Sequence, residues 1–120
     1  MKVAVTAQGE DLQSLVDPRF GRARCFIVVD LETGQWEVVD NRGDLDLAQG
    51  AGIQAARKIA ERQVQFLITG HCGPKAFRTL SAAGIEVVLG AEGTVAEVLE
   101  RFGRGELKAA PAPDVDSHWA

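Results

Sequence analysis

The second half of the chain alternates between helical segments and apolar runs of strand length. Residues 50–63 place apolar side chains on one helical face, and residues 65–69 form a run suited to a buried strand. The alternation continues with a helical segment at 74–83, an apolar run at 85–89 and an amphipathic helical segment at 93–103. Strand–helix–strand units form right-handed crossovers that place their strands parallel in one sheet. The sequence therefore predicts an α/β fold with a parallel core.

The first half of the chain adds antiparallel strands to this core. Residues 2–6 form a β-branched run, while residues 24–30 and 35–40 flank a Glu-Thr-Gly turn and predict a β-hairpin. We therefore expect a three-layer α/β architecture, with a mixed five-stranded sheet and helices on both faces. One domain is expected over residues 1–107. The segment 108–120, which contains two prolines, is expected to be a flexible C-terminal tail.

Length and composition indicate a single globular domain. The chain has 120 residues, of which 46% are hydrophobic and 25% charged, as is ordinary for a globular protein. The net charge of -4 argues against general nucleic-acid binding, and no apolar run approaches the ~20 residues that a membrane span needs. The first residues turn polar too soon for a signal peptide, so we expect a cytoplasmic protein. Two cysteines provide neither a disulfide framework nor a zinc site.

Residues 69–80, TGHCGPKAFRTL, allow two incompatible interpretations. Five residues separate Cys72 from Arg78, which is the spacing of a cysteine phosphatase loop, where a thiolate attacks phosphorus. A phosphate cradle needs successive N–H groups that point inward, yet Pro74 has no N–H and favours the first turn of a helix. We therefore favour a strand, a glycine turn and a helix. A phosphatase- or arsenate-reductase-like enzyme that uses Cys72 remains the alternative.

The favoured interpretation predicts an anion site at the carboxyl ends of the parallel strands. A helix that begins at Pro74 directs its N–H groups and positive dipole end toward the turn that contains His71 and Cys72. Three arginines lie within residues 19–24, on a long connection that can fold back over the same sheet edge. The structural alternative is a buried Cys72, a surface His71 and a solvated basic loop.

Three segments together resemble the dinitrogenase iron–molybdenum cofactor biosynthesis family. They are DPRFGRARCFIVVD, the GAG helix entry, and TGHCGPKAFRTLSAAGIEVV, and the resemblance spans about residues 2–102. It implies a ribonuclease-H-like fold and a protein that binds or carries preformed metal–sulfur clusters. Some stand-alone members of that family hold a molybdenum–copper sulfide cluster without covalent attachment. Nuclease activity is not expected, because the first strand carries no carboxylate.

The resulting hypothesis is a non-enzymatic carrier or scaffold for an anionic metal–sulfur cluster that contains iron, molybdenum or copper. We expect cluster donor and acceptor proteins as partners, and a monomer or weak homodimer. The tail carries His118 beside Trp119 and is expected to cover the cargo only when binding offsets the cost of ordering it. The candidate cofactor-binding residues are Arg19, Phe20, Gly21, Arg22, Gly50, Ala51, Gly52, Gly70, His71, Cys72 and Gly73, and the candidate metal ligands are His71, Cys72 and His118.

The two cysteines are expected to differ in environment. Strand alternation places Cys25 on the same sheet face as Ile27 and Val29, so Cys25 should be buried in the core. Cys72 precedes a predicted helix N-terminus, which lowers thiol pKa values in other proteins. The sequence therefore predicts that Cys72 has the lower pKa and reacts first with thiol reagents.

Overall fold

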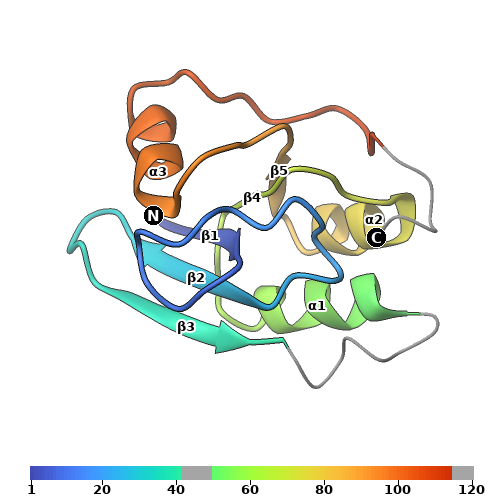
Figure 1. The fold of residues 1–120 in the computed structure, drawn as a ribbon. Helices are drawn as coiled ribbons and strands as arrows, with labels where there is room; N and C mark the ends of the chain where they lie inside the picture. The colour runs from blue at the N-terminus through green and yellow to red at the C-terminus, as the bar shows by residue number, and fades with distance from the viewer. Residues whose placement is uncertain (42–49, 115–120) are drawn as a thin grey trace.

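The computed structural model describes residues 1–41 and 50–114 of the chain. Within these residues, one five-stranded sheet lies between helices on both of its faces (Figure 1). The strands are β1 (Lys2–Ala7), β2 (Cys25–Asp30), β3 (Trp36–Asp40), β4 (Phe66–Ile68) and β5 (Glu86–Val88), and the helices are α1 (Ala51–Ala60), α2 (Pro74–Ala82) and α3 (Val95–Gly103).

The sheet is mixed, as the sequence predicts. Its strand order is β3-β2-β1-β4-β5. The pairs β1–β2 and β2–β3 are antiparallel, whereas β1–β4 and β4–β5 are parallel. The predicted hairpin and the predicted parallel core are therefore both confirmed, while the ribonuclease-H-like label stays a prediction. No helix in the described ranges is long and apolar enough to cross a membrane.

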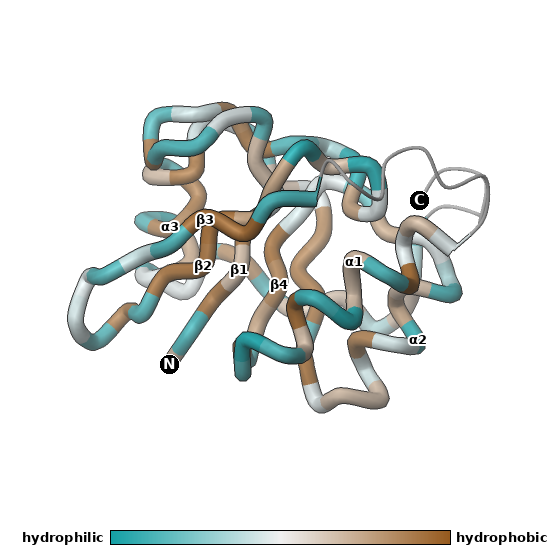
Figure 2. The backbone as a smooth tube through the Cα atoms, turned by 90° about the horizontal axis from the view of Figure 1, so that it is seen from below, coloured by the Kyte–Doolittle hydropathy of each residue, from teal (hydrophilic) through white to brown (hydrophobic). Residues whose placement is uncertain are grey.

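Successive side chains of each strand point to opposite faces of the sheet. They form two separate hydrophobic cores, one on each face. Helices α1 and α2 cover one face and α3 covers the other (Figure 1). Figure 2 shows the hydrophobic residues concentrated along the strands between these layers. The core under α1 and α2 includes Ala4, Val28, Leu67, Val87, Ala55, Ile59, Ala76 and Leu80. The core under α3 includes Val3, Val5, Ile27, Ile68, Val88, Val95 and Val98.

The helix boundaries follow local sequence signals. Helix α2 begins at Pro74, so the chain between Cys72 and Arg78 is a turn followed by helix and not a phosphate cradle. Helix α3 begins with the predicted capping box: the Glu97 N–H donates to Thr94 Oγ1 at 3.1 Å, and the Thr94 N–H donates to the Glu97 carboxylate at 2.9 Å. These hydrogen bonds to Thr94 lower the pKa of Glu97.

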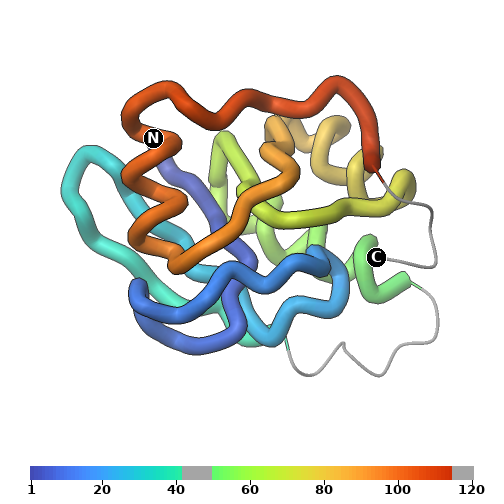
Figure 3. Tube along the Cα trace, turned by 45° about the horizontal axis from the view of Figure 1, so that its top comes forward, coloured from blue at the N-terminus to red at the C-terminus, as the bar shows by residue number. Residues whose placement is uncertain are grey.

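The segment after α3 makes defined contacts as far as Asp114, and the expected flexibility of residues 108–120 stays a prediction. Ala109 forms a bridge with Val88, and the Ala110 N–H donates to the Val87 carbonyl oxygen at 2.7 Å. Because β5 is an edge strand, it offers backbone groups that this segment can pair with. The segment then runs from α3 toward the start of α2 (Figure 3). His118 and Trp119, the proposed covering residues, lie outside the described residues.

Candidate functional site

The candidate site lies where the loops after β1 and β4 meet. Both strands are parallel neighbours, so their carboxyl ends open on the same edge of the sheet. The His71 N–H donates to the Pro18 carbonyl oxygen at 2.7 Å, and the Phe20 N–H donates to the His71 carbonyl oxygen at 3.2 Å. Arg19 is thereby paired with His71 in a short parallel bridge. The loop between the first two strands does fold back over this edge.

A buried hydroxyl pair fastens this loop to the sheet. The Thr6 hydroxyl donates to the Asp17 carbonyl oxygen at 2.6 Å and lies 2.9 Å from the Thr69 hydroxyl oxygen. Both threonine side chains are fully buried, and the Asp17 N–H returns a hydrogen bond to the Thr6 carbonyl oxygen. We did not identify Thr6 or Thr69 from the sequence. The available signal was that the apolar runs KVAVT and QFLIT each end in one hydroxyl.

Gly70 lets the two loops approach closely, and the Asp17 carboxylate makes hydrogen bonds within the first of them. A Cβ atom on Gly70 would lie 2.8 Å from the Pro18 Cα atom and 2.8 Å from its carbonyl oxygen, so only glycine permits this approach. The Asp17 carboxylate accepts hydrogen bonds from the N–H groups of Arg19 at 3.1 Å and Arg24 at 3.4 Å. Burial raises the pKa of Asp17 although these hydrogen bonds act to lower it. Gly70 therefore shapes the site by its lack of a side chain.

The loop presents arginines on either side of a buried phenylalanine. Arg19 is exposed and Arg22 is partly exposed. Phe20 is fully buried in the core under α1 and α2, where its ring centroid lies 5.6 Å from that of Phe26. The neighbouring Gly21 is buried, and its carbonyl oxygen accepts a hydrogen bond from Asn41 Nδ2 at 3.4 Å. Phe20 and Gly21 thus support the loop, and the arginines provide its positive charge.

Helices α1 and α2 both begin at this side of the molecule, at the right of Figure 1. Their N-cap residues are Gly50 and Gly73, which have no side chain to accept the first N–H groups of the helix. Neither helix has an acidic residue in its first turn. Ala51 and Gly52 are buried at the start of α1. Both helix starts therefore favour an external anion, in contrast to the self-capped start of α3.

A carboxylate from the C-terminal segment contacts the turn before α2. Asp114 Oδ2 lies 2.7 Å from His71 Nδ1, and Asp114 Oδ1 accepts a hydrogen bond from the Cys72 N–H at 3.1 Å. The His71 side chain is 39% exposed and that of Asp114 is 33% exposed. The sequence carried no local signal for this contact, because Asp114 lies in the segment expected to be a flexible tail.

The thiols lie in the interior, and the expectation of a low pKa for Cys72 is wrong. Cys72 is fully buried in the core under α1 and α2, and its thiol donates to the Gly73 carbonyl oxygen at 3.6 Å. Burial, together with the negative charge of Asp114, raises the pKa of Cys72 to about 12. The side chain is buried in the core, where a thiolate is costly, and this accounts for the difference from expectation.

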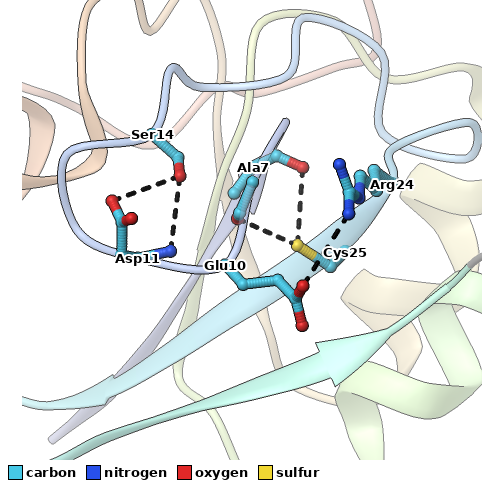
Figure 4. A network of polar contacts seen from close by, with 7 residues as sticks. Ala7, Glu10, Asp11, Ser14, Arg24 and Cys25 are labelled. Carbon is cyan, nitrogen blue, oxygen red and sulfur yellow. Dashed lines mark hydrogen bonds and ion pairs between the residues drawn. The ribbon is translucent and has the colours of Figure 1, made fainter.

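Cys25 is buried on the opposite face of the sheet, as predicted. Its side chain is 2% exposed, and its thiol donates to the carbonyl oxygens of Ala7 at 3.6 Å and Gly9 at 3.1 Å (Figure 4). Burial, followed by the charge of Glu10, raises the pKa of Cys25. Glu10 also lies 3.7 Å from the guanidinium of Arg24, so this third arginine has a local partner (Figure 4).

We expect both thiols to react slowly with a thiol reagent at pH 8 in the folded protein. Few thiolates form in either site, because burial raises both pKa values, and neither sulfur is accessible. The measurement is the labelling rate of the single variants Cys25→Ser and Cys72→Ser, with and without urea. Labelling should become fast only in urea. Fast labelling of Cys72 in the absence of urea would contradict the buried orientation.

The described residues offer anion-binding groups but no built metal centre. Among residues 1–41 and 50–114, no three His, Cys, Asp or Glu side chains come together as they would around a metal ion. Of the candidate metal ligands, His71 lies at the site surface and Cys72 points into the core, while His118 lies outside the described ranges.

The fold defines a small three-layer α/β domain with the candidate site at one edge of its sheet. The chain belongs to the dinitrogenase iron-molybdenum cofactor family, whose model matches residues 1–105. It is similar to the uncharacterised protein MJ0580 of Methanocaldococcus jannaschii, with 29% identity and coverage of 90% of each chain.

Two solved structures resemble the chain closely. The apo form of the orange protein from Desulfovibrio gigas matches with a TM-score of 0.93 and 47% identity, over 95% of this chain and 96% of that one. TM1290 from Thermotoga, a member of the DUF35 family, matches with a TM-score of 0.80 and 39% identity, over 90% and 91% of the two chains. These matches cover the whole α/β domain, so the fold assignment does not depend on one segment.

Proposed function

We propose that the protein binds a preformed, anionic metal–sulfur cluster at this edge and carries it without catalysing a reaction. The observation that carries the proposal is that the Asp114 carboxylate contacts both His71 Nδ1 and the Cys72 N–H. These contacts indicate that the two groups can bind an anion. Arg19 and Arg22 add positive charge to the same loop pair. Membership of the iron-molybdenum cofactor family supports a metal-containing cargo, which we propose to be iron, molybdenum or copper together with sulfide.

The N–H and guanidinium groups at this edge would hold the cluster through hydrogen bonds and electrostatic attraction. Cluster sulfides carry negative charge, and N–H groups at helix starts and guanidinium groups both stabilise such anions. Of the two candidate ligands that the structure describes, His71 and Cys72, only the His71 imidazole is at the surface, so it is the one of the pair that could coordinate a metal directly. A bound cluster of this kind would pass between a donor and an acceptor protein without protein–sulfur bonds to break.

The enzyme alternative receives less support from the same geometry. A nucleophilic cysteine needs an accessible thiolate, whereas burial raises the pKa of Cys72 to about 12. Arg78 is exposed on α2, one turn beyond the helix start, and is not folded back over Cys72. We therefore propose that the chain is a carrier and not a phosphatase or arsenate reductase.

The direct test is purification under anaerobic conditions, followed by a visible spectrum and elemental analysis. A cluster-loaded protein should absorb in the visible and contain sulfide with iron, molybdenum or copper in a fixed ratio to protein. The metal-free protein should regain visible absorption when titrated with tetrathiomolybdate, with and without Cu(I). Colourless protein that takes up no thiometallate, or a phosphatase activity abolished by Arg78→Lys, would count against the proposal.

A further inference from the structure

The C-terminal segment is anchored close to the site before it reaches Asp114. Leu107 packs against the core under α3, and Ala109 and Ala110 pair with β5. Only Pro111, Ala112 and Pro113 separate this pairing from Asp114. Each proline restricts its own φ angle, so the connection has few conformations to lose when the carboxylate docks. The anchored segment therefore holds the Asp114 carboxylate at a high effective concentration beside the site.

The carboxylate contacts donors that the proposed cargo needs. One oxygen of Asp114 lies 2.7 Å from His71 Nδ1, and the other accepts the Cys72 N–H at 3.1 Å. Both donors belong to the turn that leads into α2, where Gly73 is the N-cap and supplies no acceptor of its own. A second anion cannot accept the same N–H in the same direction. Cargo and carboxylate are therefore mutually exclusive at these two groups.

We infer that Asp114 is an internal occupant of the cargo site, which must leave His71 and the Cys72 N–H before an anionic metal–sulfur cluster can bind them. This inference rests on the proposed function. The segment acts as a latch: it satisfies the donors when no cargo is bound and competes with weakly bound anions. Because the pairing of Ala109 and Ala110 with β5 lies outside the contacted turn, Asp114 can leave the turn while this pairing stays in place.

The test compares Asp114→Asn and Asp114→Ala with the wild-type protein. Asparagine keeps the shape of the side chain and removes its charge, and alanine removes both contacts. The control is Glu86→Gln, which removes one negative charge from an exposed side chain at the opposite end of β5 from the site. All proteins are titrated anaerobically with tetrathiomolybdate, and binding is followed by visible absorption. A parallel NMR measurement records the His71 imidazole nitrogen shifts in the metal-free proteins.

We expect both Asp114 variants to bind tetrathiomolybdate about tenfold more tightly than the wild type. If Asp114 occupies the site in about 90% of wild-type molecules, only about a tenth can bind the ligand, and the affinity falls by that factor. Glu86→Gln should bind as the wild type does. The His71 nitrogen shifts should change in the Asp114 variants alone. Unchanged or weaker binding in both variants would overturn the latch while leaving the carrier function standing, and so would unchanged His71 shifts. Failure of every protein to bind would instead refute the carrier function, and the latch with it.

Discussion

Replacing Phe20 with alanine should lower the free energy of unfolding by about 3–5 kcal/mol, the usual cost of truncating a buried phenylalanine. Phe20 is fully buried, packs against Phe26 and ties the arginine-bearing loop to the core under α1 and α2. Urea denaturation followed by circular dichroism measures the change. Phe20→Leu, which keeps most of the apolar volume, should recover a large part of the loss.

A matched control for Phe20 lies on the same loop. Leu15 is 55% exposed, so Leu15→Ala should change the free energy of unfolding by less than about 0.5 kcal/mol. The pair of variants separates two roles for Phe20. If Phe20→Ala left stability unchanged and abolished cluster binding, Phe20 would be a contact residue for the cargo and its buried position would be wrong.

The double variant Arg19→Gln/Arg22→Gln should weaken tetrathiomolybdate binding by about a hundredfold, because each hydrogen bond to a charged group contributes about 1.5–3 kcal/mol and 1.4 kcal/mol is tenfold in affinity. Neither side chain is buried, so the free energy of unfolding should change little. Binding is measured anaerobically from visible absorption, at two salt concentrations. The dependence on salt should be weaker in the variant, since fewer charges take part.

The control is a second double variant that has the same net charge as Arg19→Gln/Arg22→Gln. Arg57 and Arg78 are exposed on α1 and α2, beyond the first turn of each helix. Arg57→Gln/Arg78→Gln should change the affinity by less than about threefold, because exposed charges that make no contact with the ligand are screened by solvent and salt. Equal losses in the two double variants would show that only overall charge matters and that Arg19 and Arg22 are not at the site.

The fold was predictable because its signals are local. The helical period of residues 93–103 and the Thr94–Glu97 box define α3 without reference to the rest of the chain. The apolar runs before and after α2 predict two parallel strands, because a strand–helix–strand unit forms a right-handed crossover. The same topology brings residues 18–20 beside His71, so the meeting of the two loops follows from strand order as well.

The parts of the site that sequence reasoning missed depend on single side-chain directions and on packing at a distance. The thiol of Cys72 points into the core because of the local turn geometry at Gly73, and residue spacing does not encode that direction. Likewise, the position of Asp114 depends on the free edge of β5, which pairs with Ala110. Composition alone classifies that proline-containing segment as disordered, because it takes no account of an available sheet edge.

The hydroxyl pair of Thr6 and Thr69 joins residues 63 positions apart, and Asp114 reaches His71 across 43 positions. Residues so far apart in the sequence are brought together only by the folded sheet. An unfolded chain therefore presents none of the donor geometry, and the cargo has almost no affinity for it. By mass action, nearly the whole binding free energy adds to the stability of the native domain, about 2.7 kcal/mol at a free cluster concentration of 100 Kd. On the proposed function, the cluster-loaded protein should therefore survive proteolysis for longer than the unloaded protein.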